Sequence, residues 1–171
     1  MQYDLIVIGA GPGGYVAAIR AAQLGLKTAV AERAEVGGTC LNRGCIPTKT
    51  LMHSANLYRE IGEAGKMGVN VTGAEADFKA MHARKAQVVE QLRGGVAQLL
   101  KGNGIDVLEG EAAFVSPESI TVSAETYTAR NFIIATGSKP AVPPIPGADL
   151  PNVVTSDEML DTDSCDYKEL V

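Results

Sequence analysis

The sequence has few of the features that mark several large classes of protein. It contains no tryptophan, its aromatic residues make up 5% of the chain, and its net charge is −5. Lysine and arginine are not clustered among aromatic side chains, so the sequence does not predict nucleic-acid binding. No apolar run is long enough to span a bilayer, and repeats and low-complexity tracts are absent. A length of 171 residues is enough for one domain or slightly more, with a substantial core.

Two further absences limit what the three cysteines can do. The chain does not open on a basic segment followed by a cleavable apolar stretch, so we expect a cytoplasmic protein rather than a secreted one held by structural disulfides. A zinc site would need more ligands, and His53, His82 and Cys165 have neither CxxC nor HxxxH spacing. The remaining two cysteines are therefore interpreted as redox or catalytic residues.

Those two cysteines lie in residues 37–49, which have the sequence GGTCLNRGCIPTK. A thiol at the start of a helix opened by Pro47 would face free backbone N–H groups and the positive end of the helix dipole, which lowers its pKa. Four residues separate Cys40 from Cys45, a loop short enough to close a disulfide, and Gly44 adds backbone freedom. This pattern favours a redox pair that opens and closes during turnover. A zinc site and two inert core thiols are the alternatives.

A second motif lies at the start of the chain. Residues 3–8 are a β-branched run typical of a buried parallel strand, and a helical pattern covers residues 15–24. Between them Gly9, Gly11 and Gly14 form GxGxxG, in which the first glycine makes a tight turn, the second lets a pyrophosphate approach, and the third allows close helix–strand packing. Strand, glycines and helix in this order predict a dinucleotide-binding site.

Glu32 narrows the choice of nucleotide. It follows a strand predicted over 27–31, about twenty residues after the glycines, where a carboxylate can accept hydrogen bonds from ribose hydroxyls. A carboxylate there disfavours a 2′-phosphate, so NADP is not expected, while FAD and NAD both remain open. The alternative is a solvated glutamate at the end of a strand.

The rest of the chain predicts an α/β fold: a Rossmann-like domain with a central parallel sheet, a small antiparallel β-meander and a long helical pair. Glycines interrupt the second long helix at Gly94-Gly95, and prolines make residues 139–147 an extended connector. We expect a first domain over 1–140 and a connector over 141–171, and an apolar strand that stops at Val171 predicts that the domain is incomplete. The expected elements are helices over 48–64 and 74–101, meander strands over 105–108, 111–114, 119–122 and 125–128, a buried strand over 130–135, a capped helical turn over 155–160 and a strand over 168–171.

These motifs resemble those of the flavoprotein disulfide reductases, in order and spacing, over essentially the whole chain. The resemblance rests on the glycine motif, Glu32, residues 37–49 and the later Ala135-Thr136-Gly137. The residues Ile46-Pro47-Thr48-Lys49 are similar to those of the lipoamide branch of the family. The resemblance implies a Rossmann-like, FAD-binding domain that carries a redox disulfide.

The resemblance also implies roles for individual residues. Cys40 corresponds to the interchange thiol, Cys45 to the charge-transfer thiol against the flavin, and Lys49 to a lysine near the flavin N5. The alternative for Lys49 is a solvated lysine in the first turn of a helix. The alternative for Ala112 and Thr136 is an ordinary role in packing or in a turn. The cofactor contacts implied are Gly9, Gly11, Gly14, Glu32, Arg33, Gly38, Thr39, Cys40, Lys49, Ala112, Ala135, Thr136 and Gly137.

For the complete protein the resemblance implies a homodimeric enzyme that passes electrons from dihydrolipoamide through Cys40 and Cys45 and FAD to NAD. Its partner would be lipoamide, or the lipoyl domain of a 2-oxoacid dehydrogenase or glycine cleavage complex. The NAD site and a catalytic histidine–glutamate pair would lie outside this chain, since neither His53 nor His82 has the expected context, and the chain alone is expected to be inactive. The alternatives are an enzyme of the mercuric or glutathione reductase type and a standalone FAD-binding thiol-redox module.

Overall fold

The computed structural model describes residues 2–162, so Cys165 and the strand predicted over 168–171 lie outside the described residues. The chain divides into two compact units. The first, here the sheet unit, comprises Met1–Asn42 and Gln91–Lys139. The second, here the helical unit, comprises Arg43–Glu90 and Pro140–Val171. The predicted domain limits at residues 140 and 141 stay a prediction.

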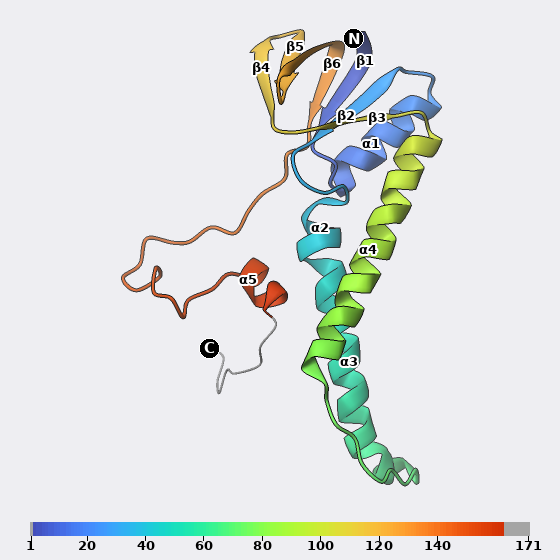
Figure 1. Cartoon of the computed structure of the whole chain (residues 1–171), viewed down its shortest axis with the longest axis vertical. Helices are drawn as coiled ribbons and strands as arrows, with labels where there is room; N and C mark the ends of the chain where they lie inside the picture. The colour runs from blue at the N-terminus through green and yellow to red at the C-terminus, as the bar shows by residue number, and fades with distance from the viewer. Residues whose placement is uncertain (1, 163–171) are drawn as a thin grey trace. The chain divides into compact units, whose positions relative to one another are not determined.

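The sheet unit is built on one six-stranded mixed sheet with the order β3-β2-β1-β6-β5-β4 (Figure 1). β1 pairs in parallel with β2 and β6, and β2 pairs in parallel with β3, whereas β5 pairs antiparallel with β4 and β6. Helix α1 (Pro12–Gln23) packs against β1 and β2. The strands are β1 (Gln2–Ile8), β2 (Thr28–Glu32), β3 (Asp106–Glu109), β4 (Ala112–Ser116), β5 (Ser119–Val122) and β6 (Glu125–Ile134).

The core of this unit is formed by the central strands, as the β-branched runs predict. Ile6 and Val7 of β1, Val30 of β2 and Ile120 of β5 are fully buried. Both faces of the parallel strands β1 and β2 are covered, which explains why their apolar residues are consecutive rather than alternating. The predicted α/β fold with a central parallel sheet and an antiparallel meander is therefore confirmed.

Three predictions about the strands were wrong in detail. The segment 105–108 was placed in the meander, but β3 pairs with β2 in the parallel part of the sheet. The segments 125–128 and 130–135 were predicted as two strands, but β6 is continuous, since its first residues pair with β5 and its later ones with β1. The second half was also expected to be buried, whereas Ile133 and Ile134 are 38% and 67% exposed.

The cysteine segment, predicted as a redox loop over 37–49, is largely helical. Helix α2 (Gly38–Arg43) carries the first cysteine and helix α3 (Cys45–Glu63) begins at the second. Gly44 separates them with φ −143° and ψ −109°, outside the helical region, so one glycine is enough to break the helix. Pro47 lies in the first turn of α3, where its missing N–H is not needed.

The helical unit contains α3, a short 3₁₀ helix η1 (Ala64–Met67), the first half of α4 (Phe78–Gly102) and α5 (Ser156–Asp161). Helix α4 begins later than predicted because Asp77 caps it, accepting a hydrogen bond from the Ala80 N–H at 2.9 Å. α4 then continues through Gly94-Gly95 without a break. Helix α5 has a capping box of Thr155 and Glu158, as its sequence predicts. Among the described helices, none has the length and apolar character needed to cross a bilayer.

Tyr3 makes the free energy of unfolding depend on pH in the alkaline range. Burial raises its pKa to about 12, and a 2.9 Å hydrogen bond donated to Asp106 adds to the effect. Because the folded pKa exceeds the unfolded value, this stabilisation is fully present below about pH 10 and is lost as the pH rises through about 12. We expect urea unfolding to show a loss of up to about 2.7 kcal/mol across that window. The loss should shrink in Tyr3→Phe and persist in Tyr58→Phe, which alters an exposed tyrosine. Equal losses in all three proteins would contradict the assignment.

Candidate functional site

The glycine loop after β1 is closely packed, and two of its glycines leave no room for a side chain. Gly9 has φ +101°, and a Cβ there would lie 2.3 Å from the carbonyl oxygen of Ala135. A Cβ on Gly14 would lie 1.8 Å from the carbonyl oxygen of Gly9. These contacts match the roles predicted for the first and third glycines of the motif, a tight turn and close helix–strand packing.

Gly11 differs, because the protein itself would tolerate a side chain there. A Cβ on Gly11 would meet only the Cα of Gly38, at an ordinary contact distance of 3.7 Å. Gly11 is the N-cap of α1, it provides no side-chain cap, and Pro12 follows at the first helical position. The start of this twelve-residue helix therefore presents backbone N–H groups and the positive end of the helix dipole beside a glycine surface. Such a surface suits a phosphate group.

Glu32 lies at the end of β2 and binds the glycine loop directly. One carboxylate oxygen accepts a hydrogen bond from the Ala10 N–H at 2.7 Å, and the other accepts one from the Ala34 N–H at 3.0 Å. Each oxygen of an ionised carboxylate has two lone pairs, so both can accept a further bond from a hydroxyl. The carboxylate thus holds the loop in place and remains a suitable acceptor for a ribose.

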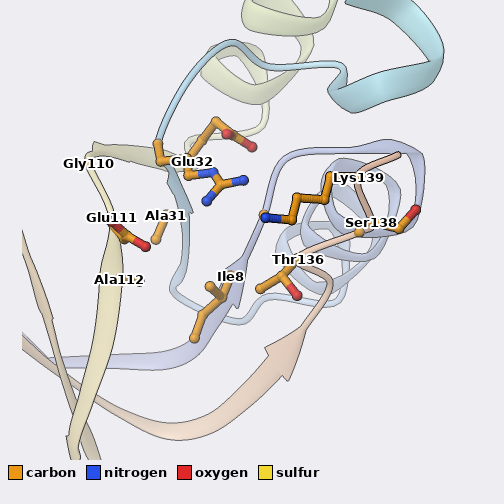
Figure 2. Close-up of a pocket in the computed structure, with 12 residues that line it drawn as sticks. Ile8, Ala31, Glu32, Gly110, Glu111, Ala112, Thr136, Ser138 and Lys139 are labelled. Atoms are coloured by element: carbon orange, nitrogen blue, oxygen red, sulfur yellow. The ribbon is translucent and has the colours of Figure 1, made fainter. Parts of the chain in front are cut away.

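A cavity of about 360 Å³ opens beside Glu32 in the sheet unit (Figure 2). It lies at the carboxyl ends of the parallel strands β1, β2 and β6, the edge at which open α/β sheets bind ligands. Six of its twelve lining residues were predicted as cofactor contacts: Gly9, Glu32, Arg33, Ala112, Thr136 and Gly137.

Sequence reasoning missed the other half of the lining. Lys139 was assigned to the extended connector and Ser138 was not predicted as a contact, yet both line the cavity. Figure 2 shows the Lys139 side chain extending over the cavity toward the side on which Glu32 lies. The sequence did offer a signal for Lys139, because this positively charged residue follows the predicted Thr136-Gly137 turn by only two residues. The further lining residues are Ile8, Ala31, Gly110 and Glu111.

The start of α2 lies against the glycine loop. The Gly37 N–H donates to the carbonyl oxygen of Ala10 at 2.8 Å, and a Cβ on Gly38 would lie 2.5 Å from the Cα of Gly11. Gly37 and Gly38 have φ +101° and +61°, so both need glycine. Thr39 follows at the surface, and Cys40 is half-buried. The predicted residue Gly38 is therefore held beside the loop predicted to bind phosphate, and Thr39 and Cys40 are the next two residues of the same helix.

The second cysteine belongs to the helical unit. Cys45 is the first residue of α3 and is exposed, and its N-cap, Gly44, provides no side-chain hydrogen bond. Lys49 is exposed one turn later. The boundary between the two units falls after Asn42, so Cys40 and Cys45 lie on either side of it. The roles of Cys45 and Lys49 stay predictions.

The remaining predicted residue, Ala135, follows β6 and donates its N–H to the carbonyl oxygen of Ile8 at 2.8 Å. This bond continues the pairing of β6 with β1, and the Ala135 carbonyl group lies close against Gly9 of the glycine loop. Within residues 2–162, no three His, Cys, Asp or Glu side chains are grouped closely enough to hold a metal ion.

Comparison with known proteins gives consistent matches. A family model described as pyridine nucleotide-disulphide oxidoreductase matches residues 3–170. The dihydrolipoyl dehydrogenase of Bacillus subtilis (strain 168) is 49% identical over 166 residues, which are 95% of this chain and 34% of that protein. The dihydrolipoyl dehydrogenase of Thermus scotoductus is 56% identical over 138 residues, 81% of this chain and 30% of that protein. The chain thus spans about a third of the length of these relatives.

A solved structure agrees with these matches. The Cu(II) complex of the HOCl-induced flavoprotein disulfide reductase RclA from Escherichia coli superposes with a TM-score of 0.80 at 32% sequence identity. The superposition covers 95% of this chain and 35% of that one. The predicted Rossmann-like architecture is therefore found in a flavoprotein disulfide reductase.

Proposed function

Because the chain belongs to the pyridine nucleotide-disulphide oxidoreductase family, we propose that it is the FAD-binding, redox-active portion of a dihydrolipoyl dehydrogenase. The observation that carries the proposal is the contact between Gly11 and Gly38. It places the loop suited to phosphate directly against the helix that carries Cys40, within one compact unit. A cofactor bound along that loop would therefore reach toward the thiol.

The residues of the sheet unit fit FAD. The glycine loop and the start of α1 would hold the pyrophosphate, with the backbone N–H groups as donors. Glu32 would accept hydrogen bonds from the ribose hydroxyls while keeping its bonds to the loop. Arg33 and Ala112 would contact the adenosine part in the cavity. When bound, FAD supplies the electron-pair acceptor that a dithiol needs to reduce a nicotinamide.

The two cysteines would carry out the exchange with substrate. One thiolate of dihydrolipoamide attacks the Cys40–Cys45 disulfide and forms a mixed disulfide with Cys40, releasing Cys45 as a thiolate. The second substrate thiol then attacks the mixed disulfide, which closes the substrate's own disulfide and releases Cys40. The substrate dithiol is oxidised to a disulfide and releases two protons to solvent, and the protein disulfide is reduced by two electrons to two thiolates. Lys49 would place a positive charge near the isoalloxazine.

The proposal for the complete protein is broader. We propose that NAD is the final acceptor, bound outside this chain, and that the protein is a cytoplasmic homodimer. Its partner would be lipoamide, or the lipoyl domain of a 2-oxoacid dehydrogenase or glycine cleavage complex. The identities of 49% and 56% with dihydrolipoyl dehydrogenases support this choice. The superposition on a different flavoprotein disulfide reductase favours, as a second candidate, another disulfide reductase of the same family.

The proposal is tested by adding FAD to the purified chain and reducing it anaerobically with dihydrolipoamide. We expect FAD uptake and, on reduction, a long-wavelength absorbance band that Cys45→Ser abolishes and Cys165→Ser leaves in place. We expect no NAD reduction, since the NAD site is proposed to lie elsewhere. A chain that takes up no FAD would contradict the proposal. A band that survives Cys45→Ser would contradict the role of this thiol.

A further inference from the structure

Asn42, inside the cysteine motif, binds the backbone just before Cys40. Its side-chain amide nitrogen donates to the carbonyl oxygens of Gly38 at 3.0 Å, Val36 at 3.1 Å and, more weakly, Glu35 at 3.4 Å. One NH₂ group thus gathers three carbonyls of a four-residue segment. Because Asn42 is half-buried, water cannot fully replace these bonds.

Arg93 fixes the orientation of this amide. Its Nε donates to the side-chain oxygen of Asn42 at 3.0 Å. A guanidinium can only donate hydrogen bonds, so the amide oxygen must face Arg93 and the amide nitrogen must face the carbonyls. Arg93 comes from α4, 51 residues further along the chain, and is half-buried in the same compact unit.

The segment held in this way is the one that touches the glycine loop. Gly37 and Gly38 both have positive φ, the Gly37 N–H bonds to Ala10, and Gly38 lies against Gly11. Cys40 follows two residues after Gly38. Loss of the Asn42 amide bonds would therefore alter the backbone that contacts the glycine loop and that leads directly to Cys40.

We propose that Arg93, acting through Asn42, is a positioning residue for the Cys40 thiol. The pair holds residues 35–38 in the conformation that keeps Cys40 half-buried beside the glycine loop, and so sets how readily the thiol is attacked. This inference rests on the proposed function for the role of Cys40 as the reacting thiol. It assigns no contact with substrate to Arg93 or Asn42.

The proposal is tested by alkylating Cys40 with iodoacetamide in the full chain carrying Cys45→Ser and Cys165→Ser, so that one thiol reacts. The alkylation rate is measured without FAD, so the result does not depend on whether the chain binds the cofactor. We expect Arg93→Met to raise the plateau rate at alkaline pH about tenfold, the size expected for the loss of one hydrogen bond from a charged donor. The midpoint of the pH profile should stay in place, because access to the thiol changes and not its ionisation.

Three variants separate positioning from general loosening of the fold. Arg93→Lys, which keeps a cationic donor, should restore the rate to within about twofold of the parent. Asn42→Asp should raise the rate as Arg93→Met does, and the double variant should be no faster than either single variant, because both act on one amide. The matched controls are Arg84→Met and Asn56→Asp, which alter exposed residues on α4 and α3.

Two results would overturn the proposal. One is an Arg93→Met rate within about twofold of the Arg84→Met control. The other is multiplication of the two single effects in the double variant, which would show that Arg93 and Asn42 act independently. If FAD binding fails while the alkylation pattern is obtained, the proposed function is wrong and the positioning role stands.

Discussion

Gly11→Ala should weaken FAD binding about 100-fold while leaving the fold intact. The added Cβ would make one ordinary 3.7 Å contact with Gly38, so the protein has space for it. On the open side of the loop, the same methyl would occupy the surface along which the pyrophosphate is proposed to lie. If the methyl displaces the pyrophosphate at a cost of about 3 kcal/mol in binding free energy, the affinity for FAD falls about 100-fold. Quenching of flavin fluorescence would measure the change in Kd, and thermal unfolding would confirm an unchanged Tm.

Gly62→Ala is the matched control for this experiment. Gly62 lies within α3, and a Cβ there would have no neighbour within 4 Å. Its substitution should leave FAD binding unchanged and stabilise the helix slightly. Tight FAD binding by Gly11→Ala would show that the cofactor does not approach this glycine, and the proposed pyrophosphate site would be wrong.

Gly14→Ala, three residues later, should instead destabilise the fold itself. Its Cβ would lie 1.8 Å from the carbonyl oxygen and 2.9 Å from the carbonyl carbon of Gly9, and both atoms belong to backbone. Either α1 or the turn at Gly9 must shift, and Gly9 is itself held against Ala135. We expect a loss of at least about 3 kcal/mol in the free energy of unfolding. For a chain of this length, Tm should fall by about 6–12 °C.

The control for Gly14→Ala is Gly13→Ala, since Gly13 belongs to the same helical turn and a Cβ there would have no neighbour within 4 Å. Circular dichroism should show a normal Tm for Gly13→Ala and a lowered one for Gly14→Ala, both without cofactor. Equal Tm values for the two would mean that helix α1 can move away from β1, and the close packing assigned to the third glycine would be refuted.

Local patterns were sufficient to predict the backbone conformation around the candidate site. The strand, the positive φ turn at Gly9, the helix after Pro12 and the carboxylate at the end of β2 all lie within the first 32 residues. Each follows from the conformational limits of a few neighbouring residues. The capped start of α5 was predictable for the same reason. Within one turn, the Thr155 side chain accepts a hydrogen bond from the backbone near Glu158, and the Glu158 side chain accepts one from the Thr155 backbone N–H.

Predictions failed where a segment's partner is distant in sequence. β3 is a four-residue strand whose own sequence cannot say that it pairs with β2, more than seventy residues earlier. The segment around Arg130 was divided into two strands, although pairing with β1 and β5 joins it into one. Lys139 was assigned to an extended connector, because only the folded sheet brings it to the cavity at the ends of β1 and β2.

The sequence by itself determined which chemistry this chain is equipped for. The glycine motif, Glu32 and the two cysteines separated by four residues predict a nucleotide loop and a pair of thiols, because each depends on short-range geometry. Only the tertiary structure decided how the first of these thiols is held. Gly38 packs on Gly11 and Asn42 is oriented by Arg93, contacts across 27 and 51 residues that depend on the whole sheet unit being folded. Short-range conformational preferences specify the parts, and long-range packing and hydrogen bonding set their positions.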